Sequence, residues 1–282
     1  GLAVYLSGGH FKPEALMPRA AMLLDSGWYI PLETLTDEFY RSQHEIGYLE
    51  AGAFVEFLVE TWGWEAFSRF YRDIHPLEGK DSQAAAMNMA MLAHFGLSFP
   101  EIERRFLEAL RLQPTNFEFK EDVRLVVNFY ETLRDYQKAY DPSAYYLTAW
   151  MLDAGEMRQR GIVADYLRHP LGRVNLAFET MLQTAWWNLY TSNYLEVDRY
   201  LEAVKAVLDA AARGLTDPFS ENDLAADYFE VVQVLGEQGL QAQRIRIEGD
   251  SARVLVSNTT FELQEVYLKR HAQGWRVVVD AQ

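Results

Sequence analysis

The spacing of apolar residues changes once along the chain, close to Gly239, and this change constrains the fold more than any other feature. Before Gly239, apolar residues recur every three or four positions, as in amphipathic helices. After it, four segments alternate or are rich in β-branched residues: Arg244–Glu248, Ala252–Ser257, Phe261–His271 and Trp275–Val279. We therefore expect a mainly α protein with a small C-terminal antiparallel β-meander, at about residues 243–280. Such a meander is too small to be stable alone, so it should pack on the preceding helices.

Helix breakers and capping residues divide the first 114 residues into short helices. Leu2–Leu6 should end a helix, because Ser7-Gly8-Gly9 follows it. A loop is expected over the stretch that holds Pro13 and Pro18, and Thr34 or Thr36 is a candidate cap for a short helix.

Stronger helical signals follow this stretch. A helix should run from Tyr48 to Trp62, stop at Gly63 and continue as a second helix. Asp81 is a candidate cap for the Ala- and Met-rich run that ends at Phe95. Ser98-Phe99-Pro100-Glu101 has the pattern of a capping box with Pro in the first turn, which predicts a helix to about Leu112.

The remaining residues are more uniform, and Pro114 marks the boundary that we expect between two domains, 1–114 and 115–282. Further helices are expected at about 119–140, 143–154, 156–168, 171–190, 194–213 and 221–238.

The composition excludes several classes of protein. The 282 residues contain no cysteine, which rules out a disulfide scaffold, thiolate zinc sites, iron–sulfur clusters and a cysteine nucleophile. The formal net charge is -15, from 41 acidic and 26 basic residues, which argues against a nucleic-acid-binding protein. No segment reaches the roughly 18 apolar residues that a membrane span needs.

Catalytic motifs are incomplete in this sequence. The six histidines are His10, His44, His75, His94, His169 and His271, and none pairs with another at the i, i+4 spacing of a chelating helix. The segment from His44 to Tyr48 begins like the zinc-binding motif His-Glu-x-x-His but has Tyr in the fifth position, so we interpret it as a polar helix start. A nucleophile elbow and a phosphate-binding loop are both missing.

Two other residue groups have ordinary structural interpretations. The carboxylate pairs Asp37/Glu38, Glu101/Glu103 and Asp223/Asp227 are expected on solvated faces, because 41 acidic residues produce such pairs by chance. The cluster from Trp186 to Tyr190 has helical spacing and is expected to pack in the core, although it also suggests a ligand-binding surface.

The first third of the chain resembles a known family in four segments, which occur in the family's order. They are Gly1–Leu6, Ile30–Leu35, Tyr48–Leu58 with the following Trp62-Gly63-Trp64, and Phe95–Glu103. These segments resemble the part of a peptidase MA-like (gluzincin) zinc metallopeptidase that follows its third zinc ligand. The resemblance covers about residues 1–112, and the helical region from residue 115 onward has no comparably clear relative.

The resemblance implies one catalytic residue in this chain. In the related aminopeptidase N type, a Tyr before a Gly-Ala pair donates a hydrogen bond to the tetrahedral oxyanion, and Tyr48 matches that position, with Ala51-Gly52 in place of Gly-Ala. A phenol suits this role because it is a neutral donor at pH 7. Alternatively, Tyr48 is an ordinary aromatic residue on a helix face.

The family's zinc ligands are missing from this sequence. In the family, the Glu ligand stands directly before the residue that matches Gly1, and His-Glu-x-x-His lies further upstream. We therefore expect a fragment whose parent is a zinc-dependent peptidase acting on peptides or proteins. The chain alone should hold no cofactor or metal and should be inactive, because zinc needs about three protein ligands. Relatives of this type are often exported, which suggests an extracytoplasmic location.

Two other functions stay open. The chain could be a non-catalytic binding or scaffold module that kept peptidase-like helices without the metal site. It could also be a helical ligand-binding protein that uses Trp186 and Trp187, which requires an apolar pocket beside them.

Overall fold

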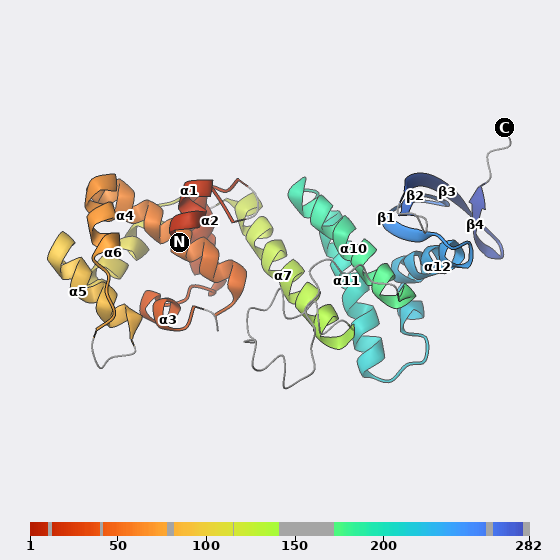
Figure 1. The fold of residues 1–282 in the computed structure, drawn as a ribbon, viewed down its shortest axis with the longest axis horizontal. Helices are drawn as coiled ribbons and strands as arrows, with labels where there is room; N and C mark the ends of the chain where they lie inside the picture. Colours follow the sequence, from red (N-terminus) through yellow and green to blue (C-terminus); the bar gives the residue numbers. More distant parts are fainter. Residues whose placement is uncertain are drawn as a thin grey trace. The chain divides into compact units, whose positions relative to one another are not determined.

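The protein is mainly α-helical with a small antiparallel sheet at its C-terminal end, as the change of period predicts (Figure 1). The computed structural model describes residues 1–10, 13–39, 42–77, 82–114, 116–140, 172–257 and 262–278. Two compact units are present, Gly1–Val127 and Asn128–Gln282. The division between them falls inside a helix, whereas the boundary expected from the sequence, 114/115, lies just before that helix.

The first unit consists of helices. They are α1 (Leu2–Ser7), α2 (Leu16–Ser26), α3 (Leu32–Asp37), α4 (His44–Arg72), α5 (Gln83–Phe95), α6 (Phe99–Arg111) and the first turns of α7 (Phe117–Tyr140). Gly63 interrupts α4 with φ 82° and ψ 155°, a conformation that favours glycine, so the predicted stop between two helices is confirmed. The predicted ends of α1 at Gly8 and of α5 at Gly96 are also confirmed, each with a left-handed glycine.

Several predicted helix starts in this unit are wrong. The expected loop around Pro18 is the first turn of α2, where proline is tolerated because the first N–H groups of a helix have no partner within it. Thr34 and Thr36 lie inside α3, whose N-cap is Pro31. Asp81 lies outside the described residues, and the α5 cap is Ser82, whose hydroxyl accepts the N–H of Ala85.

The predicted start of α6 is correct, but its capping box does not form. Ser98 is the N-cap of α6, yet its side chain makes no cap hydrogen bond within the described part of the chain. Instead, the Phe99 N–H donates to Oδ1 of Asn88, at 2.8 Å, from the neighbouring helix α5. A tertiary contact has therefore replaced the local one.

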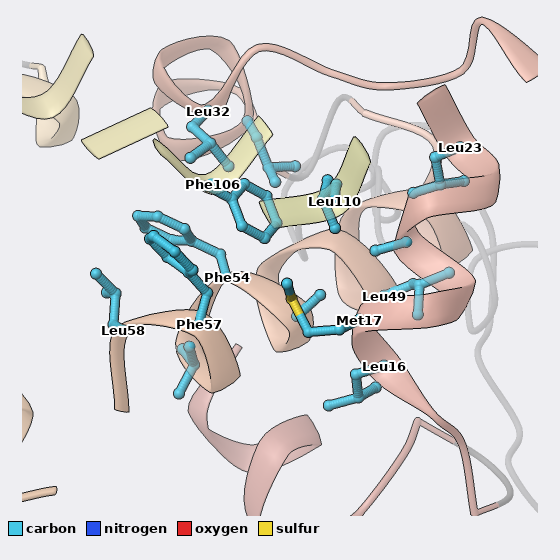
Figure 2. Close-up of a cluster of buried hydrophobic side chains, with 14 of the residues drawn as sticks. Leu16, Met17, Leu23, Leu32, Leu49, Phe54, Phe57, Leu58, Phe106 and Leu110 are labelled. Carbon is cyan, nitrogen blue, oxygen red and sulfur yellow. The ribbon is translucent and has the colours of Figure 1, made fainter. Parts of the chain in front are cut away.

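The core of the first unit lies between α2, α4 and α6 (Figure 2). From α4, Phe54 and Phe57 point toward Phe106 of α6, with ring centroids 5.3 Å and 5.5 Å apart. Leu16 and Met17 of α2 close the opposite side. Burial of these large apolar side chains supplies most of the driving force for folding the unit.

The helix α1 lies against α4 at a point of very close approach. A Cβ atom added to Gly52 would lie 2.7 Å from Cγ1 of Val4. One added to Gly1 would lie 2.5 Å from the carbonyl oxygen of Ala51. Glycine at these two positions is therefore required for the backbones of α1 and α4 to approach this closely.

The second unit combines helices with the sheet. After the end of α7 come α10 (Arg173–Tyr190), α11 (Tyr194–Ala212), the short 3₁₀ helix η1 (Pro218–Glu221) and α12 (Asp223–Glu237). The bounds of α7, α10, α11 and α12 fall within about two residues of those predicted, which is the usual uncertainty of helix ends. The helices expected at 143–154 and 156–168 lie outside the described residues.

The sheet is an antiparallel meander in the order β1-β2-β3-β4. Its strands are β1 (Gln241–Glu248), β2 (Ser251–Ser257), β3 (Leu263–His271) and β4 (Gly274–Val278). One face is apolar and packs on α10 and α12, with Ile245, Val254 and Leu268 buried. Tyr228 of α12 fixes this packing, because its hydroxyl hydrogen bonds with the Ile245 carbonyl and the Tyr200 hydroxyl, both at 3.0 Å.

Among the described residues, no helix is long and apolar enough to cross a membrane.

Candidate functional site

Tyr48, the residue that the resemblance singles out, lies in a cluster of aromatic rings. It occupies the first part of α4 and is partly buried. The His10 ring stacks on it with centroids 4.2 Å apart, and the His44 ring lies 4.4 Å away. Phe39 contacts a third side of Tyr48 edge-on at 5.0 Å. The ring of Tyr48 is therefore held between two imidazoles and a phenyl group.

The two histidines reach Tyr48 from different elements. The start of α4 places His44, because the N-cap Gln43 accepts the Ile46 N–H at 2.8 Å. His10 follows the turn after α1, and its backbone N–H donates to Oε2 of Glu14 at 3.1 Å. The rings of His10 and His44 come within 5.1 Å of each other.

Burial and nearby charges together set the protonation of His10. Glu45 is only 4% exposed, and its carboxylate contacts Nε2 of Gln43 at 2.8 Å and Nδ1 of His44 at 3.0 Å. Burial, with the nearby charges of His44 and of the Gly1 amino group, lowers the pKa of His10 to about 4, although Glu45 acts in the opposite direction. His10 is therefore a neutral imidazole at pH 7.

An ion-pair network lies beside this aromatic cluster. Arg19 of α2 pairs with Glu14, at 3.1 Å, and with Asp122 of α7. All three side chains are at most 5% exposed. A cavity of about 10 Å³ lies beside them and is also lined by His10 and Glu45, a volume close to that of a single water probe.

The amino terminus of the chain reaches the same region. Gly1 contacts α4 at Ala51 and Val55, so it lies about one helical turn beyond Tyr48. The amino group of Gly1 is close enough to His10 to influence its pKa. In the resemblance, the position directly before Gly1 is that of the third zinc ligand.

The groups gathered here can donate and accept hydrogen bonds but do not form a metal site alone. The described residues contain no group of three or more His, Asp or Glu side chains that could hold a metal ion. The phenol of Tyr48 is a neutral hydrogen-bond donor, and the imidazole of His10 is a neutral donor and acceptor. Such groups suit stabilisation of an oxygen on which negative charge develops.

Sequence reasoning singled out Tyr48 but missed the two histidines that lie against it. His10 and His44 lie far apart in the sequence. His44 begins an incomplete zinc motif, and His10 directly follows a glycine turn. The turn at Gly8 and the close packing of α1 on α4 bring them together. Histidines at i, i+4 share one helix, whereas His10 and His44 come together only through tertiary structure.

The expectation that the carboxylate pairs are solvated is confirmed for Asp37, which is exposed, and is wrong for Glu103 and Asp227, which are partly buried. Asp37 accepts the Ala84 N–H and the Ser82 hydroxyl. Glu103 accepts the Tyr29 hydroxyl at 2.9 Å and the Leu32 N–H at 2.8 Å. Asp227 accepts the indole N–H of Trp275 at 3.1 Å and pairs with Arg270. These carboxylates fix loops and strands to helices.

The aromatic cluster of α10 is only partly in the core. Leu189 is buried as expected, but Trp187 is 55% exposed and Tyr190 is 48% exposed, so the packing prediction is wrong for these two residues. The rings of Trp186 and Tyr190 stack along the helix with centroids 5.5 Å apart. The exposed rings of Trp187 and Tyr190 form a surface that a ligand could reach, and the ligand-binding hypothesis stays a prediction.

Comparison of the chain with protein-family models, with curated proteins and with solved structures found no match.

Proposed function

We propose that this chain forms one wall of the active site of a zinc-dependent metallopeptidase. Tyr48 would donate a hydrogen bond to the oxyanion that forms when a peptide carbonyl is attacked by water. The observation that carries the proposal is the place of Tyr48. It lies between His10 and His44, about one turn from Gly1, the residue that in the resemblance follows the third ligand.

The packing around Tyr48 suits a positioned donor. Stacking against His10 and edge contact with Phe39 limit rotation of the phenol ring. His10 is neutral at pH 7, so the phenol stacks on an uncharged ring. A donor fixed before the reaction stabilises the transition state without reorganisation.

Zinc itself would not be held by the described residues, since they lack a suitable ligand group. In a site of this class, the metal polarises the substrate carbonyl and lowers the pKa of bound water. The proposal therefore requires that the ligands come from sequence outside this chain. The chain alone should show no chelator-sensitive hydrolysis when incubated with zinc and a generic peptide.

The decisive experiment is to read the coding sequence on the amino-terminal side of Gly1. A Glu codon directly before Gly1, with His-Glu-x-x-His further upstream, supports the peptidase. If neither motif is present, the proposal fails and the alternative, a non-catalytic binding or scaffold module, takes its place.

A further inference from the structure

Basic side chains gather on the outer face of the sheet, the face that does not pack on α10 and α12. The strands place on it five cations, Arg244, Arg246, Arg253, Lys269 and Arg276. Only two carboxylates of the strands, Glu248 and Glu265, share this face. The outer face is therefore net positive by three charges, in a chain with a formal net charge of -15.

Two pairs of these cations stand directly opposite each other on neighbouring strands. Arg246 faces Arg253 across β1 and β2, and Lys269 faces Arg276 across β3 and β4. Like charges at directly opposed positions destabilise a sheet. Folding alone therefore does not favour this arrangement.

The first cation pair is neutralised within the sheet, but the second is not. Arg246 pairs with Glu248 at 2.7 Å, and Arg253 pairs with Glu265 at 2.6 Å. Lys269 and Arg276 form no ion pair with a carboxylate of the described residues, and both side chains are exposed. Their positive charge is available to a partner.

Apolar side chains lie among the charges. Tyr267 is 48% exposed and stands next to Arg253 in register, while Val278 faces Tyr267 from β4. Leu263 at the start of β3 is 63% exposed. The face thus offers alternating cationic and apolar contacts with the spacing of an extended strand.

We propose that the outer face of the sheet docks an acidic segment of another protein, in which Asp or Glu alternates with apolar residues. Charge complementarity argues for an acidic partner, because the cations of this face outnumber its carboxylates. The exposed Tyr267, Val278 and Leu263 argue for apolar residues between the acids. The inference is independent of the peptidase proposal, since it concerns only the second unit.

A polypeptide fits this face better than a polyanion does. Glu248 and Glu265 lie within the face and would repel a dense row of phosphates. The rest of the chain carries the whole negative excess, which also repels a nucleic acid or an anionic membrane at long range. A short segment with spaced carboxylates meets less of both repulsions, because it carries fewer charges for its length.

The test is a binding titration with the full chain. The probe is a fluorescein-labelled peptide of repeating Glu-Leu-Asp-Gly units, followed by fluorescence anisotropy at low salt and at physiological salt. The comparison peptide has Gln and Asn in place of Glu and Asp. The proposal predicts saturable binding of the acidic peptide that weakens as salt screens the charges, and little binding of the neutral peptide.

Two double variants with equal charge loss separate this face from general electrostatics. K269Q/R276Q removes two unpaired cations of the face and should weaken binding by about tenfold. R199Q/R213Q removes two exposed cations, one in α11 and one directly after it, and should leave the affinity within about twofold. Circular dichroism of each variant confirms the fold.

Three results would overturn the proposal. The first is an acidic peptide that does not bind, and the second is an affinity that both double variants reduce equally. The third is tighter binding of an oligo-dT strand or of phosphatidylserine vesicles than of the peptide, which would assign the face to a nucleic acid or a membrane.

Discussion

The most unusual single residue in the first unit is Glu50, a fully buried carboxylic acid on α4. Its Oε2 accepts the Ile30 N–H at 3.0 Å, while Oε1 has no hydrogen-bond partner among the described residues. Burial, and the nearby charge of Glu103, raise the pKa of Glu50 to about 8, although the Ile30 N–H acts in the opposite direction. Glu50 is therefore mostly protonated at pH 7 and connects α4 to the extended link before α3.

Glu50 should make the stability of the protein depend on pH. Its pKa is higher in the folded state, about 8, than the ordinary 4.5, so the folded state binds more protons between these values. The contribution of Glu50 to stability is therefore complete below about pH 4.5 and is lost as the pH rises toward 8. The substitution E50Q keeps the shape of the protonated acid but has no proton to lose.

We expect E50Q to be more stable than the wild type at pH 8. From pH 5 to pH 8, the stability of E50Q relative to the wild type should rise by on the order of 3 kcal/mol. Urea unfolding at both pH values measures it. E60Q changes an exposed acid on the same helix and should behave like the wild type. Equal pH dependence in E50Q and the wild type would show that Glu50 is ionised in the fold.

At the scale of elements, the cap of α6 comes from a neighbouring helix. Because Asn88 of α5 accepts the Phe99 N–H and the Ser98 hydroxyl caps nothing described, N88A should cost about 0.5–2 kcal/mol of stability. S98A should cost clearly less. The shift in the urea unfolding midpoint measures both. A larger loss of stability in S98A than in N88A would show that Ser98 caps α6 after all.

The crossing of α1 and α4 should depend on the small residue at Gly52. In G52A, a methyl group would lie 2.7 Å from Cγ1 of Val4, so we expect a net destabilisation of about 1–2 kcal/mol despite the better helix propensity of alanine. V4A removes the opposing methyl groups. The cost of G52A should therefore be smaller in the V4A background, and strictly additive costs would argue against the contact.

At the scale of the whole molecule, the sequence predicts the fold class but not every element. The change of period near Gly239 predicts helices and then a meander, because each period follows from backbone geometry alone. The helix α2 was missed since Pro18 resembles a loop residue, although proline is tolerated in a first helical turn.

The candidate site was predictable only in part, for a related reason. Tyr48 was singled out by a resemblance in the order of four segments, which can be read from the sequence alone. His10, His44 and the buried network of Arg19 come together only when α1 and α2 pack on α4 and Asp122 of α7 pairs with Arg19. No spacing rule within one element can reveal contacts of that kind.

The measurement that tests the central claim most directly is the kinetic effect of Y48F in the protein encoded by the chain together with its upstream sequence. Y71F, which changes an exposed tyrosine of the same helix, is the control. We expect Y48F to lower kcat for peptide hydrolysis by about 10²–10³-fold, with KM and zinc content unchanged, because the proposed hydrogen bond would form only in the transition state. Y71F should match the wild type. A Y48F enzyme that binds zinc and retains wild-type kcat, or a parent protein that binds no zinc and cleaves no peptide, would contradict the account.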